Sequence, residues 1–263
     1  GEAVLKSGTR LGPAEIAIAA AQGVTGLAVY KPLKAAVLST GDEVFEPGEA
    51  IEEGAIYDAN RHMVMAILEK LGCSVSDLGI LPDKPDLIRE TIRHAADSHD
   101  LLVSSGGMSV GEEDHLCAAI EALGSLNFWR LAIKPGRPVG LGQIQASDGR
   151  HVPMIGLPGN PVAAMVCTLI FARPALCQMA GMGWQEPVGF DLPAAFEKRK
   201  KPGRREYLRA RVRDGRAEVF ASEGSGRISG LSWAEGLVEI GDGERHIRPG
   251  DPVRFLPYGS FGL

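Results

Sequence analysis

Leu101-Leu102-Val103-Ser104-Ser105-Gly106-Gly107 is the stretch that decides the fold, because an uncharged run of five residues leads directly into two glycines. A short apolar run bounded by glycine is typical of a strand buried on both faces of a parallel sheet. Upstream, Ala35-Ala36-Val37-Leu38-Ser39-Thr40 has the same character and also leads into a glycine, Gly41. The sequence therefore predicts parallel strands that each end in a glycine-containing loop.

Helical and strand-like segments alternate around these two runs. Helices are expected at 60–71, 85–96, 116–123 and from Pro161 to about Met179, and further strands at 74–81, 128–133 and 152–157. This alternation predicts an α/β fold over residues 34–184, a mostly parallel sheet with helices on both faces. Such sheets bind ligands beyond the carboxyl ends of their strands.

The two ends of the chain have a different character. Residues 1–33 are expected to form a lead-in with a short alanine-rich helix at 13–21. Residues 185–263 carry short β-like runs separated by glycine turns, which predicts a small C-terminal all-β sandwich or barrel.

The charge balance restricts the partners. With 28 Lys and Arg against 33 Asp and Glu, the net charge is −5, which argues against nucleic acid as the main partner. The basic cluster Lys198-Arg199-Lys200-Lys201 is interpreted as a solvated turn or strand end.

Cysteine usage and hydropathy point to the cytoplasm. The four cysteines are far apart and form no C-x-x-C pair, so reduced thiols are expected. Residues 1–10 lack the apolar core of a signal peptide. The longest apolar run, 162–172, is too short to span a bilayer, so we expect a buried helix and no membrane partner.

The first two glycine loops carry polar groups of different kinds. Thr40-Gly41-Asp42-Glu43 places carboxylates at a strand end, where they could hold Mg²⁺; a turn glycine followed by a helix-start acid explains the motif equally well. Ser105, Gly106 and Gly107, with Ser109 and Gly111, would expose backbone N–H groups to a phosphate. Asp114 closes that loop as a metal ligand or, more commonly, as an N-cap.

The third loop and a basic turn complete the expected site. In Pro158-Gly159-Asn160-Pro161, Asn160 fits an N-cap, and the helix N-terminus would also attract an anion. Between the second and third loops, Arg130, Lys134 and Arg137 supply three cations around a turn. Cations opposite carboxylates at one sheet edge predict a site for a phosphorylated ligand and a divalent metal.

Six motifs in order closely resemble the MoeA family, the molybdopterin molybdenumtransferases, which are similar to the E domain of gephyrin. They are Ser39-Thr40-Gly41-Asp42-Glu43, Tyr57-Asp58-Ala59-Asn60-Arg61, Gly79-Ile80-Leu81-Pro82-Asp83, residues 104–114, Lys134-Pro135-Gly136-Arg137-Pro138 and Leu157-Pro158-Gly159-Asn160-Pro161. The resemblance implies a MogA-like molybdopterin-binding domain followed by a β-barrel domain. It also implies Mg²⁺-dependent insertion of molybdate into adenylylated molybdopterin with release of AMP.

Site roles follow from the resemblance. Glu43, Asp83 and Asp114 would surround the metal and pyrophosphate, and Lys134 joins them as a catalytic residue. Arg130, where relatives often have Lys, and Lys134 would contact anionic oxygens or molybdate. The remaining cofactor-binding residues would be Thr40, Gly41, Asp42, Ser105, Gly106, Gly107, Ser109, Gly111, Arg137, Pro158 and Asn160.

The family also implies partners and leaves alternatives open. A homodimer is expected, with molybdopterin adenylyltransferase and molybdoenzyme apo-proteins as further partners. Family members have a substantial region before the position of residue 1, so this chain is expected to be a fragment or a shortened relative. A non-catalytic molybdopterin-binding module therefore remains an alternative. Molybdopterin adenylyltransferase is a weaker one, since the Thr40 and Asn160 loops and the added β domain favour the MoeA family.

Overall fold

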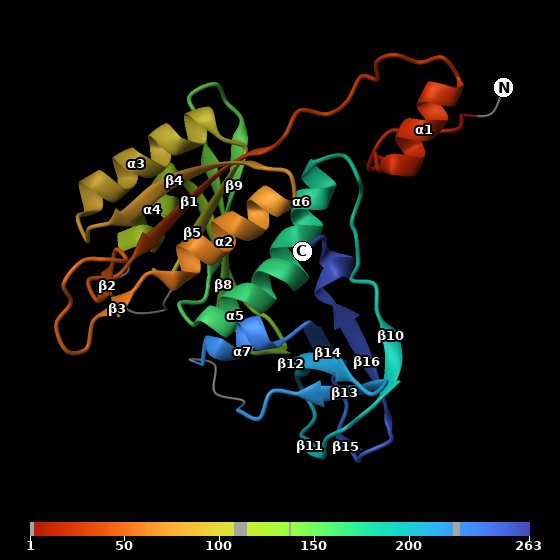
Figure 1. Ribbon diagram of the computed structural model, residues 1–263. Helices are drawn as coiled ribbons and strands as arrows, with labels where there is room; N and C mark the ends of the chain where they lie inside the picture. The colour runs from red at the N-terminus through yellow and green to blue at the C-terminus, as the bar shows by residue number, and fades with distance from the viewer. Residues whose placement is uncertain (1–2, 108–114, 137, 223–226) are drawn as a thin grey trace.

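A mixed six-stranded sheet forms the larger part of the molecule (Figure 1). The computed structural model describes residues 3–107, 115–136, 138–222 and 227–263. The strand order is β4-β1-β5-β9-β8-β6. β4 (Ser74–Leu81), β1 (Lys34–Thr40), β5 (Leu101–Ser105) and β9 (His151–Leu157) are parallel, while β8 (Pro138–Gln145) runs antiparallel to both of its neighbours, β9 and β6 (Gly124–Arg130).

The mostly parallel α/β fold is confirmed, and its strands β1, β4, β5 and β9 lie where the sequence predicts them. The single strand expected at 128–133 is wrong: the chain instead forms β6 and a separate two-residue strand, β7 (Ile133–Lys134). β8 was not predicted, because Pro138, Gly140 and Gly142 indicate turns locally. Its regular pairing with both β6 and β9 overrides that local preference.

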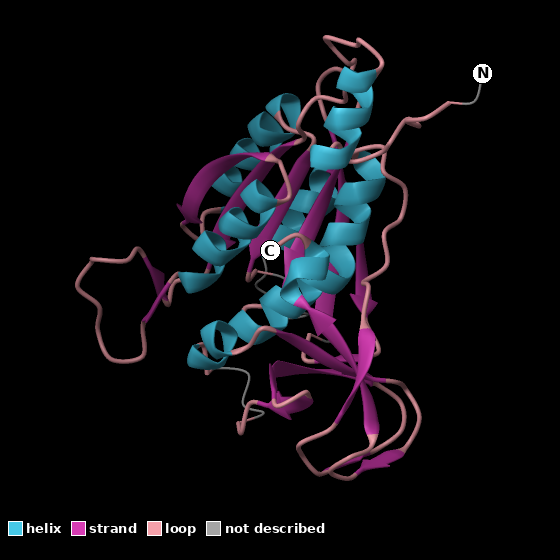
Figure 2. Cartoon of the chain, turned by 45° about the vertical axis from the view of Figure 1, so that its right-hand side comes forward, coloured by secondary structure: helices cyan, strands magenta, loops and turns pink. Residues whose placement is uncertain are grey.

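Helices cover both faces of this sheet (Figure 2). On one face, α3 (Pro85–Ser98) and α4 (His115–Leu123) bury Ile88, Ile92 and Ile120 against Leu38 and Leu102. On the other face, α2 (Ala59–Lys70), α5 (Pro161–Cys167) and α6 (Arg173–Met179) pack against the alternate residues of β1 and β5. Alternate side chains of one strand thus pack into two different cores, as expected for a sheet covered on both sides.

The helix that begins at Pro161 is long and apolar. α5 and α6 are joined by one π-helical turn, η1 (Thr168–Ala172), and the whole segment extends over 19 residues to Met179. Within the described residues, this is the one helix that is long and apolar enough to cross a membrane, because the apolar run at 162–172 lies inside a longer apolar helix. It is nevertheless a core helix, with 67% of its most apolar window buried inside the structure.

The C-terminal residues form a second, curled sheet. Its order is β10 (Phe190–Pro193), β16 (Pro252–Pro257), β14 (Gly236–Ile240), β12 (Arg205–Arg213) and β13 (Arg216–Val219), with antiparallel neighbours. A bridge between Ala194 and Ala217 connects its two edges, which gives the barrel-like closure expected from the sequence. A ribbon of β11 (Lys198–Lys200) and β15 (Arg245–Ile247) lies beside it, and α7 (Ser229–Trp233) and η2 (Tyr258–Phe261) add two helical turns that were not expected.

The two sheets are joined by backbone pairing as well as by an apolar contact. β7 follows β6 in the chain but pairs in parallel with β12, with Glu206 opposite Lys134. The Arg205 N–H also donates to the Ala132 carbonyl at 2.8 Å. Met165 and Leu169 of the long helix pack with Tyr207 and other residues of the second sheet. Part of the first unit is therefore built into the second.

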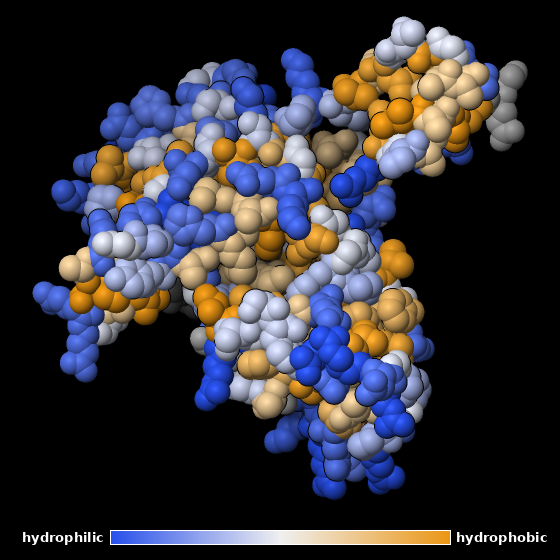
Figure 3. All heavy atoms as spheres, viewed as in Figure 1, coloured by the Kyte–Doolittle hydropathy of each residue, from blue (hydrophilic) through white to orange (hydrophobic). Residues whose placement is uncertain are grey.

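A lead-in helix stands apart from both sheets. α1 (Pro13–Ala21) has no buried residue within 13–21 and exposes Ile16. In the hydropathy view it carries a largely apolar surface away from the main body (Figure 3). β2 (Val44–Phe45) and β3 (Ile56–Tyr57) form a small ribbon at the opposite side of the molecule.

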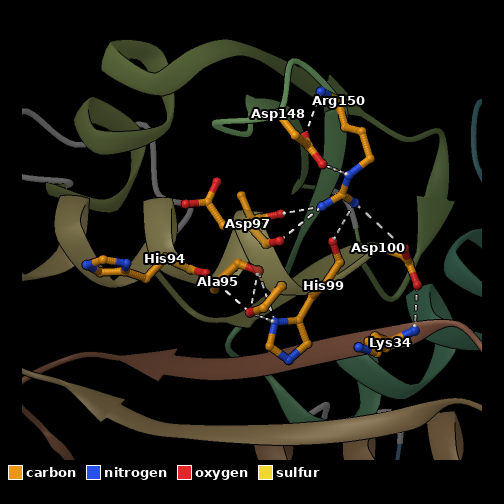
Figure 4. A network of polar contacts seen from close by, with 10 residues as sticks. Lys34, His94, Ala95, Asp97, His99, Asp100, Asp148 and Arg150 are labelled. Carbon is orange, nitrogen blue, oxygen red and sulfur yellow. Dashed lines mark hydrogen bonds and ion pairs between the residues drawn. The ribbon is translucent and has the colours of Figure 1, made fainter.

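A polar network closes the edge of the first sheet at which β1, β5 and β9 begin (Figure 4). Arg150 donates to the carbonyls of Ala96, Asp97 and His99 at the end of α3 and to the Asp148 carboxylate at 2.6 Å. Asp97 accepts from the N–H and hydroxyl of Ser147 at 2.7 and 2.9 Å, and these bonds hold the pKa of Asp97 below its ordinary value. The network fastens the β8–β9 turn to α3, at the edge opposite the glycine loops.

Candidate functional site

The loops singled out from the sequence follow the carboxyl ends of four neighbouring parallel strands. In register, Thr40 of β1 lies opposite Leu81 of β4, Ser39 opposite Ser105 of β5, and Ser105 opposite Leu157 of β9. The Gly106 N–H also donates to the Leu157 carbonyl at 3.3 Å. The topology thus brings the loops at 41–43, 82–83, 106–107 and 158–160 to one edge of the sheet.

The second loop lies directly against Thr40. Gly107 has φ of +65°, and a Cβ at that position would lie 2.1 Å from the Thr40 hydroxyl oxygen. Only glycine fits such an approach. The buried hydroxyl oxygens of Ser39, Thr40 and Ser104 have no hydrogen-bond partner within the described residues. The floor of the second loop is therefore polar and closely packed.

The third loop is held by two asparagines. The Asn160 side-chain oxygen accepts from the N–H groups of Val162 and Ala163 at 3.1 and 3.3 Å, so Asn160 caps α5. Asn60 of α2 is buried and donates its side-chain N–H to the Gly159 carbonyl at 2.7 Å. Sequence reasoning assigned no role to Asn60, although the motif at 57–61 already contained it.

A buried arginine fixes the first loop. Arg61 is 1% exposed and donates to Asp58 at 2.9 Å, to both oxygens of Glu46 at 2.5 Å and to Asp77. Burial alone would lower the pKa of Arg61, but its hydrogen bonds to Asp58 and Asp77 and the charges of these two carboxylates raise it. Glu43 and Glu46 lie in the same short segment, so Arg61 also holds Glu43 in place through Glu46. The Ile56 N–H donates to the Glu43 carbonyl at 2.8 Å and fixes this segment further.

A cavity of about 760 Å³ lies between this edge and the C-terminal sheet. Predicted site residues that line it are Glu43, Gly106, Gly107, Lys134, Pro158 and Asn160. The residues that line the cavity do not include the predicted site residues Thr40, Gly41, Asp42, Asp83 and Ser105. Ser109, Gly111, Asp114 and Arg137 lie outside the described residues, and Arg130 is placed only as the end of β6.

The cavity has a cationic wall that comes partly from the C-terminal sheet. Lys134, Lys198 and Arg209 line it together. Arg209 is 5% exposed, donates to the carbonyls of Arg227 and Ser222 at 2.6 Å each, and lies over the Phe220 ring. Burial lowers its pKa. Sequence reasoning missed Arg209, since no local pattern connects β12 to the first sheet.

The interpretation of residues 198–201 as a solvated turn or strand end is correct in that they include a strand, β11, but two of the lysines are not solvated. The Lys198 side chain is only 10% exposed and reaches the cavity. Lys200 is 2% exposed and donates to the carbonyls of Lys201, Asp242 and Gly243. Both lie on β11, whose pairing with β15 turns alternate side chains inward.

The described residues do not by themselves assemble a metal site. In residues 3–107, 115–136, 138–222 and 227–263, no three His, Cys, Asp or Glu side chains come together in a metal-binding group. Glu43 faces the cavity, whereas Asp83 lies 3.7 Å from the His115 ring nitrogen. The third predicted ligand, Asp114, is outside the described residues.

Comparisons with known proteins agree with this architecture. Residues 36–178 match the family model described as a probable molybdopterin binding domain, and residues 191–258 match the MoeA C-terminal region, domain IV. The chain is 34% identical to a molybdopterin molybdenumtransferase of Haemophilus influenzae, over 98% of this chain and 64% of that protein. It is 31% identical to one of a Nostoc species, over 97% of this chain and 60% of that protein.

A solved structure gives the same picture. The crystal structure of the molybdopterin biosynthesis MoeA protein from Pyrococcus horikoshii is similar with a TM-score of 0.80 and 28% identity. The match covers 98% of this chain and 62% of that one. The chain thus spans somewhat less than two thirds of the length of these relatives.

Proposed function

Because the chain belongs to the MoeA family of molybdopterin-binding proteins, we propose that it carries the transferase chemistry named in its relatives. In this reaction molybdate enters the dithiolene of adenylylated molybdopterin and AMP is released. The observation that carries the proposal is the cavity itself, which glycine loops of the molybdopterin-binding domain and cations of the C-terminal region line together.

Each wall of the cavity suits one part of such a substrate. Gly106 and Gly107 present backbone close to the ligand space, which suits a phosphate. Lys134 and Arg209 supply positive charge for the oxygens of molybdate or of a leaving phosphate. Phosphoanhydride cleavage depends mainly on positioning and charge stabilisation, and preorganised donors of this kind supply both.

The remaining predicted residues have supporting roles in this proposal. Thr40 and Ser105 hold the floor of the glycine loops, and Asn160 shapes the third loop by capping α5. Gly41 and Asp42 belong to the segment that carries Glu43. Ser109, Gly111, Arg130 and Arg137 remain candidate phosphate and pterin contacts.

The proposed reaction also uses Mg²⁺. Within the described residues, Glu43 and Asp83 belong to no group of three metal-binding side chains, so we assign the third ligand to Asp114, which lies outside the described residues. Carboxylate oxygens are the ligands that Mg²⁺ prefers. A magnesium titration of the reaction tests this point directly.

Oligomer and location also belong to the proposal. The apolar side chains exposed on and after α1, including Ile16 and Val29, would be covered in a homodimer. We assign residues 34–184 and 185–263 to separate domains and residues 1–33 to a lead-in. The four cysteines form no disulfide and three of them are buried, which suits a reducing cytoplasm. Light scattering coupled to size-exclusion chromatography measures the dimer.

The deciding experiment measures products of the purified chain with adenylylated molybdopterin. Molybdate-dependent release of AMP supports the transferase. ATP-dependent adenylylation of molybdopterin in its place would show an adenylyltransferase. Calorimetric binding of the pterin without turnover, in the presence of molybdate and Mg²⁺, would show that this chain is a binding module.

A further inference from the structure

A buried carboxylate lies between two lysines at the cavity wall. Lys198 Nζ is 3.1 Å from one carboxylate oxygen of Glu206, and Lys134 Nζ is 3.8 Å from the other. The side chains of Glu206 and Lys198 are only 11% and 10% exposed, and that of Lys134 is 38% exposed. The three groups form a compact cluster with a net charge of +1.

The cluster is assembled from distant parts of the chain. Lys134 comes from β7, Lys198 from β11, and Glu206 from β12, where it is in register with Lys134. Both lysines line the cavity, whereas Glu206 is not part of its described lining. The two lysines therefore border the ligand space, and Glu206 contacts both of them from outside the lining.

We propose that Lys198 is a second oxyanion contact beside Lys134, and that Glu206 is their resident counterion. The ligand would be a tetrahedral dianion, and this rests on the proposed function, in which that dianion is molybdate. Without the Glu206 charge, the two ammonium groups would repel each other more strongly and hold a dianion more tightly. With Glu206 in place the pair stays ordered in the empty site, and its attraction for the dianion is reduced so that the ligand can leave.

Coulomb's law sets the size and the sign of the effect. A unit charge and a dianion separated by roughly 7 Å in a water-like dielectric repel each other enough to change affinity about tenfold. Removing the Glu206 charge should therefore tighten oxyanion binding. A carboxylate that only supported the fold would give the opposite sign, because its loss would disorder the lysines.

The test is calorimetric titration of the full chain with sodium molybdate and, separately, sodium sulfate, at low and at raised salt. Glu206→Gln is expected to lower Kd about tenfold and to steepen its salt dependence. Glu206→Asp, which keeps the charge, should stay close to the unmodified protein. Lys198→Met should raise Kd about tenfold, and Lys198→Met with Glu206→Gln should return it near the starting value.

Glu239→Gln is the matched control. Glu239 is a carboxylate of similar exposure, 17%, that bridges Arg205 and Arg254 on the same sheet and is not part of the described cavity lining. Its loss should lower Tm without tightening oxyanion binding. Thermal melts of all variants show which are folded, and the double variant still tests the Glu206 charge if the single one unfolds.

Unchanged or weaker oxyanion binding in folded Glu206→Gln would overturn the counterion role, and unchanged binding in Lys198→Met would overturn the contact. Binding of molybdate or sulfate is measured without turnover, so these outcomes are independent of AMP release. If the chain releases AMP but neither substitution has its expected effect on binding, the roles of Lys198 and Glu206 are refuted and the transferase proposal stands. If both substitutions have their expected effects but no AMP is released, the transferase proposal is refuted and the roles of Lys198 and Glu206 stand.

Discussion

Replacement of Gly136 by alanine probes the packing that places the lysine turn. Gly136 is buried, has φ of +105° and lines the cavity. A Cβ there would lie 2.4 Å from the Cys167 sulfur of α5, whose thiol donates to the Gly136 carbonyl at 3.5 Å. Two separate costs are therefore expected, one from the backbone angle and one from the overlap.

The two costs can be separated in magnitude. Holding a non-glycine residue at positive φ costs about 1–3 kcal/mol, and forcing an extra methyl into a packed contact costs about 1–3 kcal/mol. We expect Gly136→Ala to lower the free energy of unfolding by about 3 kcal/mol. Cys167→Ala removes one buried atom and should cost about 1 kcal/mol. In the double variant the overlap is gone, so the loss should be about 2–3 kcal/mol rather than the additive value.

Urea unfolding followed by tryptophan fluorescence measures all four proteins of this cycle. The expected coupling is about 1–2 kcal/mol in favour of the double variant. Oxyanion affinity should fall in Gly136→Ala and recover in part with Cys167→Ala, because the turn carries Lys134. Strict additivity of the two substitutions would refute the overlap and, with it, this account of how the lysine turn is held.

Four further predictions concern other parts of the molecule. Lys134→Met should reduce oxyanion affinity and AMP release at least about tenfold with a small change in Tm; equal affinity would remove Lys134 from the site. Burial raises the pKa of the Cys167 thiol to about 12, so mass spectrometry should find it unlabelled by a disulfide reagent at pH 8 until the protein unfolds; rapid native labelling would contradict its burial. Asp97 has a depressed pKa in the folded state, so its contribution is present above the unfolded pKa of about 4 and is lost as pH falls. Asp97→Asn should accordingly lower Tm at pH 7 and converge with the unmodified protein under acid conditions, and an equal deficit at every pH would argue against the charge. Asp114→Asn should weaken the Mg²⁺ dependence of AMP release and leave the circular dichroism spectrum intact; an unchanged metal titration would exclude Asp114.

The first sheet could be predicted because its information is local. Runs such as 35–40 and 101–105 carry their own pattern, and their parallel arrangement brings the following loops to one edge without any knowledge of side-chain contacts. The same reasoning failed at β8, where Pro138 and two glycines imitate a turn. There the pairing with β6 and β9 decides the structure, and no local pattern shows it.

Only one of the three residues of the cationic wall, Lys134, was predicted as a site residue from the sequence. Lys134 stands in a recognisable motif, but Lys198 of β11 and Arg209 of β12 are more than sixty residues further along the chain, and both line the cavity through tertiary contacts that no local pattern shows. Asn160 shows the opposite case: its role as the N-cap of α5 was predicted, and its side-chain oxygen does cap that helix. Sequence patterns located the loops, and tertiary pairing decided which side chains face the cavity.

The two-residue strand β7 also bears on how the cavity could open. Ile133 and Lys134 follow the first sheet in the chain but are hydrogen-bonded into the second. If the C-terminal sheet swings away from the glycine loops, Lys134 must travel with β12, and the backbone must bend between β6 and β7, between β7 and β8, and between α6 and β10. Gly106 and Gly107 would then separate from Lys134 and Lys198 in one movement. Opening would release both ends of a bound ligand together, while the spacing of the two lysines stays fixed.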